Sequence, residues 1–484
     1  MDLLKKLLKP ENVFLILAIF WGTILTFINP PFQSFDEPEH FYKIYAFTEG
    51  TLNFKKITSI TDGTLIFKKP QTLPVQIIPV NIVRIVVELK QLNTYIGENK
   101  TINKPQKISP KTILSQSKYP LDKNFKTLVV HMIPSYTIVS YIPHTITLTI
   151  LKSLNTPPVY MMFILRLCSL FLYTALIYAA IKLTPVKKYT FALISIAPLP
   201  IYLGATINTD HLVIGLCFLL TAYTLRLIYK TEKIDTKKLL LFFFLIFLIC
   251  VCKFTYLPMI LLLLVIPEEK FVSTGLKIKS FITMLLVCIA WIAGFTVYNI
   301  KIFAGMFNYY SNTSALQTII YTIKHPITYL FCIAKTIIIN TNEYITRMLS
   351  DFGQSDTNLP SIIIYGYLGL LILNALFYDK QEKPFSKKQK YIFAFTILAV
   401  LIVTLTAVLI IFSYNPDGLI KVFKGRYLLP VLPLFLFLFD NSKFKQCKTN
   451  LFVVSIVYSL IFMLCFIFTL INRYYLNFLP VDIL

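Results

Sequence analysis

The chain has 484 residues, of which 56% are hydrophobic and only 14% are charged, and its mean hydropathy is +0.68. Soluble domains average about 25% charged residues, so this composition excludes a soluble protein and indicates a membrane protein. The formal net charge of +24 would suit nucleic-acid binding. The lysines, however, lie between apolar runs, which is typical of topology signals and anionic-lipid contact, and we expect no nucleic-acid partner.

The first apolar run, Val13–Ile28, predicts a retained membrane span, because no small-residue cleavage site follows it. A polar segment from residue 29 to about 126 follows, with helical periodicity only around 73–92. The next stretch, 128–154, is apolar enough to span but contains two prolines and two histidines. We predict a surface or re-entrant helix there, because only then do five short basic loops lie on the N-terminal side of the membrane.

Ten further apolar runs predict spans, which gives an all-α polytopic membrane protein with about eleven transmembrane helices. The N-terminus is expected in the cytoplasm, and residues 1–484 are expected to form one membrane domain with extracytoplasmic loops at 29–154 and 301–360. The ten runs are approximately Leu165–Leu183, Phe191–Thr206, Leu212–Tyr229, Leu239–Val251, Tyr256–Ile266, Phe281–Ile300, Ile362–Phe377, Ile392–Phe412, Leu428–Phe439 and Leu451–Ile471.

A cluster of ionisable residues follows the first span, in the segment "NPPFQSFDEPEHFYK". Pro38 favours a helix from 38 to 47, and one carboxylate before it is expected to cap that helix. A cap needs only one acceptor, so the remaining residues suggest chemistry. A carboxylate beside a second acid has a raised proton affinity and can serve as a general base. The cluster comprises Asp36, Glu37, Glu39 and His40.

Other polar residues are expected at the outer ends of spans. Taken singly, a helix cap or a snorkelling side chain accounts for each of Arg166, Asn208, Asp210 and Lys253. The segment "KGRYLLPVLPL" differs, because it places basic residues outside, against the positive-inside rule. We expect an anionic headgroup or a phosphate beside these residues, which are Lys421, Lys424 and Arg426.

Neither a P-loop nor a dinucleotide-binding glycine motif is present, so a transferase with an outward site would use a lipid-linked donor. Several segments resemble a bacterial membrane family called domain of unknown function 2142. "PPFQSFDEPEHF" resembles its PP-x-Q-x-x-DEP-x-H signature, and "FILRLCSL" resembles the start of its second span. Four later segments resemble segments of that family and occur in the same order: "GATINTDHLVIGLCFLL", "KFTYLPMILLLL", "DFGQSDTNLP" and "GRYLLPVLPL". The last two add Asp356 and Tyr427 to the substrate-binding candidates.

The family is similar to the GT-C glycosyltransferases, and the resemblance implies an inverting transfer of a sugar from a polyprenyl-phosphate carrier. Asp36 or Glu37 would deprotonate an acceptor hydroxyl, which belongs to a glycan, a lipid or a protein. Arg426, supported by Lys424 or Lys253, would bind the phosphate. The expected substrate-binding residues are His40, Arg166, Asn208, Asp210, Lys253, Asp356, Lys424, Arg426 and Tyr427.

No cofactor is expected, and Mg²⁺ or Mn²⁺ held by Asp36, Glu37 and Asp210 is the less favoured alternative. The expected location is the bacterial plasma membrane, with the site facing outward and membrane lipids as partners. Two other readings stay open. A flippase for a lipid-linked glycan would carry charges near the middle of several spans. A non-catalytic membrane subunit would tolerate Asp36→Asn.

Overall fold

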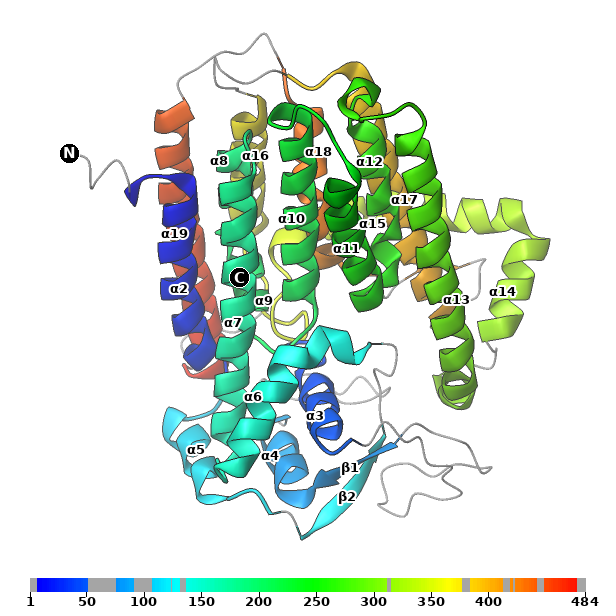
Figure 1. Ribbon diagram of the computed structural model, residues 1–484. Coiled ribbons are helices and arrows are strands. Elements are labelled where there is room, and N and C mark those ends of the chain that lie inside the picture. The colour runs from blue at the N-terminus through cyan, green and yellow to red at the C-terminus, as the bar shows by residue number, and fades with distance from the viewer. Residues whose placement is uncertain are drawn as a thin grey trace.

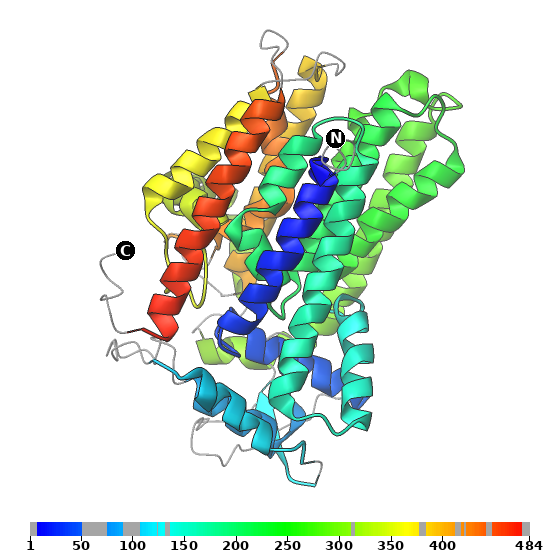
Figure 2. The same cartoon turned by 90° about the vertical axis from the view of Figure 1, so that its left-hand side faces the viewer.

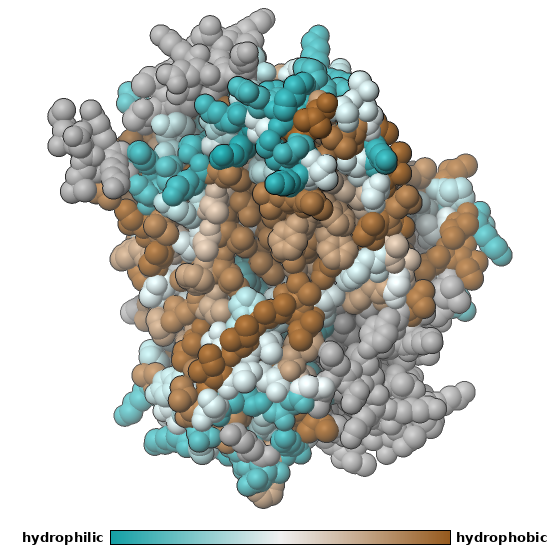
Figure 3. Space-filling view, viewed as in Figure 1, coloured by the Kyte–Doolittle hydropathy of each residue, from teal (hydrophilic) through white to brown (hydrophobic). Residues whose placement is uncertain are grey.

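The computed structural model describes residues 7–50, 75–90, 107–122, 124–130, 136–310, 315–376, 384–411, 418–420, 423–441 and 448–476. Among these residues, long helices stand side by side above a smaller layer of short helices and one two-stranded antiparallel sheet (Figure 1). The space-filling view shows a broad hydrophobic band between two hydrophilic zones (Figure 3). This arrangement is the one expected of a chain that crosses a bilayer.

Six helices among the described residues are long and apolar enough to span a membrane. A seventh span arises if α14 (Ala315–Lys324) and α15 (Pro326–Leu349), which meet at a bend of 102°, count as one. The structure therefore confirms a helical membrane protein but does not confirm the expected eleven spans. The six helices are α2 (Pro10–Ile28), α7 (Pro158–Leu183), α10 (Asp210–Tyr229), α13 (Leu276–Tyr310), α17 (Lys387–Ile411) and α19 (Lys448–Tyr474).

Proline breaks several of the other expected spans. Pro258 and Pro430 lie inside 3₁₀ turns that precede short α-helices, and Pro198 starts a new helix in the run 191–206. Proline cannot donate the backbone hydrogen bond that a helix interior needs, so each run is divided. The shorter helices are α8 (Lys188–Ser195), α9 (Pro198–Gly204), α11 (Thr236–Cys252), η3 (Phe254–Leu261), α12 (Leu262–Val265), η4 (Glu268–Lys270), α16 (Ser361–Leu376), η5 (Gly425–Val431) and α18 (Leu432–Leu438).

A layer below the span ends is built from the described part of residues 29–154, and we call it the first-loop layer (Figure 1). Its strands pair antiparallel, with Val75 opposite Val130 and Pro79 opposite Lys126. Apolar side chains of α3 are buried in one cluster with side chains of β1 and of the helix α4 that follows β1. The elements are α3 (Glu37–Thr48), β1 (Val75–Pro79), α4 (Val80–Lys90), α5 (Pro110–Ser115), η1 (Gln116–Lys118), β2 (Lys126–Val130), η2 (Ile138–Tyr141) and α6 (Ile142–Ser153).

Two expectations for the loops are met only in part. The helix expected over 38–47 is present as α3. In the stretch 128–154, where one helix was expected, residues 128–130 belong to β2, residues 131–135 lie outside the described residues, and η2 and α6 form the helical part from Ile138 to Ser153. The expected loop 301–360 is largely helical and contains the end of α13 together with α14 and α15. Behind the site, α15 packs on η5 so closely that Gly425 contacts the backbone of Tyr344 and Met348.

Candidate functional site

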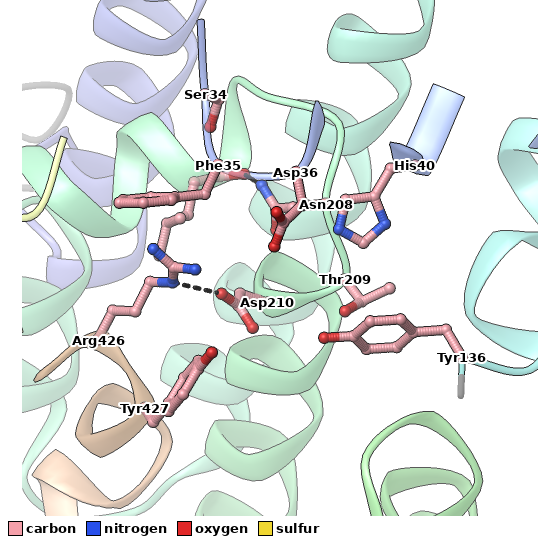
Figure 4. Close-up of a pocket in the computed structure, with 11 residues that line it drawn as sticks. Ser34, Phe35, Asp36, His40, Tyr136, Asn208, Thr209, Asp210, Arg426 and Tyr427 are labelled. Carbon is pink, nitrogen blue, oxygen red and sulfur yellow. Dashed lines mark hydrogen bonds and ion pairs between the residues drawn. The ribbon is translucent and has the colours of Figure 1, made fainter. Parts of the chain in front are cut away.

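A small polar pocket lies where the first loop, the start of α10 and η5 meet (Figure 4). Its volume is about 20 Å³, which is about the space that one water molecule needs. Four stretches that are far apart in the chain meet here. Three of them were singled out from the sequence, and the fourth contributes Tyr136, which was not. The lining residues are Ser34, Phe35, Asp36, His40, Tyr136, Leu203, Asn208, Thr209, Asp210, Arg426 and Tyr427.

Glu37 lies next to the pocket residue Asp36 and forms a fully buried ion pair with Arg166. Arg166 donates to both carboxylate oxygens, from Nε at 2.8 Å and from a terminal nitrogen at 2.7 Å. The backbone N–H groups of Phe32 and Ile207 donate to the same carboxylate at 3.1 and 3.0 Å. Arg166 also donates to the carbonyl oxygens of Thr26, Asn29 and Pro30. Four donors occupy the Glu37 carboxylate, so this residue fixes the position of the loop.

Asp36 differs from the buried Glu37, because Asp36 is exposed and lines the pocket. It occupies the N-cap position of α3 in the left-handed conformation, with φ 53°, and its side chain makes no capping hydrogen bond. Aspartate tolerates this conformation better than most residues. In Figure 4 its carboxylate points into the space between Arg426 and His40. Of the two carboxylates proposed as the base, Asp36 is therefore the one placed to meet a ligand.

The opposite wall is a charged network centred on Asp210. Lys253 donates to its Oδ1 at 3.0 Å, and Arg426 donates from Nε to its Oδ2 at 3.1 Å. Arg426 also pairs with Asp351 at 3.3 Å and has only 7% of its side chain exposed. Two carboxylates thus hold the Arg426 guanidinium in one orientation beside the pocket.

Lys424 adds a cation next to this network. Its Nζ donates to Ser355 Oγ at 3.2 Å, and among the described residues it forms no ion pair. Burial lowers the pKa of Lys424 below its ordinary value. The ring of Phe35 lies over both Lys424 and Arg426, at 4.9 and 4.2 Å from the ring centre. A lysine that is removed from water without a carboxylate partner can gain strongly from an incoming anion.

His40 and Tyr136 form the remaining side of the pocket, and Tyr141 contacts His40 without lining the pocket itself. The Nδ1 atom of His40 and the Tyr141 hydroxyl are 2.6 Å apart, and the His40 and Tyr136 rings are 5.5 Å apart. Burial lowers the pKa of His40 to about 3 and raises the pKa of Tyr136 to about 12. Both side chains are therefore neutral near pH 7, and they can offer hydrogen bonds but no charge to a ligand.

Some residues predicted for the site have other surroundings. Arg166 is buried behind the pocket, and Asp356 pairs with Arg473 of α19 at 2.8 Å. Asn208 lines the pocket but also caps α10, since its Oδ1 accepts the backbone N–H of His211 at 3.1 Å. Lys253 reaches the site through Asp210 and its ring contact with Tyr427. The position of Lys421 lies outside the described residues.

The structure also brings in residues that the sequence did not single out. Asp351 fixes Arg426, and Ser355 binds Lys424. Both lie within the stretch "DFGQSDTNLP", where only Asp356 had been selected. Phe35 and Tyr136 supply the aromatic surfaces of the pocket. The sequence could have indicated Asp351, because it is a carboxylate at the start of a stretch that was already singled out. Nothing in the sequence around Tyr136 indicated a place in the pocket.

Two of the three carboxylates considered for a divalent cation are already engaged by cations. Glu37 is saturated by Arg166 and two backbone groups, and Asp210 by Lys253 and Arg426. Within the part of the chain that the structure describes, no three His, Cys, Asp or Glu side chains are arranged to hold a metal ion. The donor set here therefore fits an anion beside cations better than a cation beside carboxylates.

Comparison with known proteins gives one finding. A family model described as "Predicted membrane protein (DUF2142)" matches residues 19–435, which include every residue that lines the pocket. No curated protein and no solved structure matches the chain. The match covers most of the 484 residues and agrees with the resemblance found in the sequence. The chain therefore belongs to DUF2142, a family of predicted membrane proteins.

Proposed function

We propose that the protein is a GT-C-type glycosyltransferase that moves a sugar from a polyprenyl-phosphate carrier to a hydroxyl group outside the cytoplasm. The acceptor is a glycan, a lipid or a protein. The protein would lie in a bacterial plasma membrane with its N-terminus in the cytoplasm and its pocket facing outward. The observation that carries this proposal is the exposed carboxylate of Asp36, which faces a fixed guanidinium across one pocket.

In this reaction Asp36 takes the proton of the acceptor hydroxyl. The hydroxyl oxygen forms a bond to the anomeric carbon, while the bond from that carbon to the phosphate oxygen breaks. Polyprenyl phosphate leaves, and the configuration at the anomeric carbon inverts. The carboxylate and the leaving group then lie on opposite sides of the sugar, which suits a base and a cationic wall that face each other.

Arg426 and Lys424 would bind the phosphate as negative charge develops on it. Asp210 and Asp351 hold Arg426 in place, so little reorganisation is needed at the moment of reaction. Phe35 covers both cations and would move aside for the donor. Because the pocket has room for about one water molecule, binding of a sugar requires it to widen.

The test compares purified wild type with Asp36→Asn, using a panel of polyprenyl-phosphate sugars and isolated envelope acceptors. Loss of the general base should lower the rate of transfer by about 10²–10⁴-fold while donor binding is retained. Glu88→Gln is the matched control, because this carboxylate lies in the same layer with 36% of its side chain exposed and forms an ion pair with Arg84 on the surface of α4. It should transfer at the wild-type rate.

Other outcomes would redirect the proposal. Equal rates for Asp36→Asn and wild type would remove Asp36 from the chemistry. Failure of the wild type to use any donor, combined with movement of a fluorescent lipid-linked glycan between leaflets in proteoliposomes, would favour a flippase. Neither transfer nor movement, with normal envelope glycan in Asp36→Asn cells, would favour a non-catalytic subunit.

A further inference from the structure

A large apolar groove is lined by residues of α2, α5, α7 and α19, and none of them lines the pocket. Its volume is about 700 Å³, and it runs between the pocket-side ends of three candidate spans, α2, α7 and α19. In both ribbon views α5 lies below the ends of α2 and α19 (Figure 2). Residues of α5 line the groove. The residues that define its shape are Phe27, Ile28, Leu114, Phe163, Leu167 and Tyr475.

The lining leaves almost nothing for a polar ligand. The Tyr475 hydroxyl donates to the carbonyl oxygen of Ile28 at 2.7 Å, so it is already engaged. Phe27 is 52% exposed and Leu114 is 55% exposed. Apolar side chains that face a groove of this size favour a hydrocarbon occupant over water.

The level of the groove matches one leaflet of a bilayer. Its lining on α7 runs from Tyr160 to Leu167, which is about 10 Å at 1.5 Å per residue. One leaflet of a 30 Å hydrocarbon core is about 15 Å deep. Tyr160 and Tyr475 lie at the end of the groove nearest the first-loop layer, which is the interfacial level that tyrosine prefers.

A positively charged residue follows one of the lining residues in the chain. Lys111 lies on α5, next to the lining residue Pro110, and it is exposed. Among the described residues Lys111 forms no ion pair, so its charge is available to a headgroup. We propose that this groove is a binding site for an anionic phospholipid, with an acyl chain between α2, α7 and α19 and the headgroup beside Lys111.

The occupant is distinct from the sugar donor, and the site does not depend on the proposed function. Phe27, Ile28 and Leu167 line the groove, whereas Ser34 to Asp36 line the pocket. The two sets of lining residues have no member in common, and the nearby Arg166–Glu37 pair is fully buried and lines neither. The groove and the pocket are therefore separate sites.

The test is quenching of one tryptophan by a phosphatidylglycerol with brominated chains in nanodiscs. The two native tryptophans are replaced (W21F, W291F), and Phe27→Trp places the reporter in the groove. Phe171→Trp is the matched control, because Phe171 is 71% exposed on α7 but does not line the groove. Unlabelled phosphatidylglycerol, phosphatidylcholine and undecaprenyl phosphate then compete for quenching.

One lysine near an anionic headgroup contributes about 1 kcal/mol, which is about a fivefold preference. At the Phe27→Trp reporter, phosphatidylglycerol should displace the brominated lipid about fivefold better than phosphatidylcholine does. Lys111→Glu should abolish this preference, and Lys324→Glu, an exposed lysine on α14, should keep it. The Phe171→Trp reporter should show no preference.

Three results would overturn the proposal. Absence of quenching at the Phe27→Trp reporter would mean that no lipid chain enters the groove. Equal competition by the two phospholipids at both reporters would mean ordinary lipid contact without a site. Stronger competition by undecaprenyl phosphate would assign the groove to the carrier instead.

Discussion

Asp36 and Glu37 are neighbours in the sequence, yet Asp36 is exposed at the pocket while Glu37 is fully buried against Arg166. The pair of adjacent carboxylates therefore divides two tasks. Glu37 ties the first loop to α7 and to the turn before α10 through four donors. Asp36 directly precedes that anchor in the chain and lines the pocket. Stability and chemistry should consequently respond to different substitutions.

Glu37→Gln should destabilise the fold strongly, because Arg166 would keep its charge without a buried counter-charge. Breaking one side of a buried ion pair typically costs about 3–5 kcal/mol. The measurement is thermal unfolding of detergent-purified protein, with Asp36→Asn as the neighbouring control. Asp36→Asn should unfold at the wild-type temperature. If Glu37→Gln retained wild-type stability but lost sugar transfer, Glu37 would take part in the chemistry.

His40 should make the fold acid-sensitive. Its pKa is lowered from 6.5 to about 3 by burial. As the pH falls from 6.5 towards 3, the unfolded chain gains a proton that the folded protein does not, so stability is lost at up to about 1.4 kcal/mol per pH unit. Unfolding temperature measured against pH should fall less steeply for His40→Gln than for wild type. His325→Gln is the control, because this histidine is exposed, and its unfolding temperature should change with pH as that of wild type does. The same pH dependence in all three proteins would contradict the prediction.

At the scale of elements, the contact between η5 and α15 decides where Arg426 lies. A Cβ atom on Gly425 would lie 2.6 Å from the Met348 backbone nitrogen and closer still to the Tyr344 carbonyl oxygen. Backbone atoms of a packed helix cannot yield as a flexible side chain can. This close approach is the reason that a glycine precedes Arg426, and it links the loop after α15 to the cationic wall of the pocket.

Gly425→Ala should therefore separate η5 from α15 and weaken the hold of Asp210 and Asp351 on Arg426. We expect donor binding to weaken by at least tenfold, measured by titration of a polyprenyl-phosphate sugar against purified protein. Gly369→Ala on α16 is the control, since a Cβ there meets nothing within 4 Å. It should bind the donor as wild type does. Unchanged binding in Gly425→Ala would show that the pocket does not depend on this contact.

The elements also show how far the sequence alone could lead. Pro38 and its carboxylates predicted α3, because local capping and proline chemistry determine that helix start. The strands β1 and β2 were missed, because each is a five-residue apolar stretch whose partner is distant in the chain. Periodicity cannot distinguish such a run from a piece of helix. Likewise, Asp36 was selected from its own segment, whereas the role of Asp351 depends on a contact with Arg426 that only the folded chain creates.

For the whole molecule, the polar chemistry gathers at one end of the spans. The pocket, the Asp210 network and the first-loop layer lie together there, while the buried Lys187–Asp440 pair joins loops at the other end (Figure 1). A protein that works from one face of a membrane needs a fixed orientation. The distribution of short basic loops predicts that the end with Lys187 is cytoplasmic.

Labelling of single cysteines tests this orientation. Lys118→Cys on η1 should react with a membrane-impermeant maleimide on intact spheroplasts, and Lys237→Cys at the start of α11 should react only after permeabilisation. Cys447→Ser serves as the background, and the seven cysteines in the described residues are buried or half-buried. The reverse labelling pattern would mean that the protein is inserted the other way round.

The ion pair between Glu37 and Arg166 can form only after both residues have been synthesised. The two residues are 129 positions apart, so a ribosome adding 5–20 residues per second makes Arg166 about 6–26 s after Glu37. During that interval the first loop lacks the guanidinium that gathers the carbonyl groups of Thr26, Asn29 and Pro30. The pocket is thus assembled only after α7 has been synthesised and inserted. A nascent chain that stalls before this helix carries Asp36 without the ion pair that fixes the neighbouring loop.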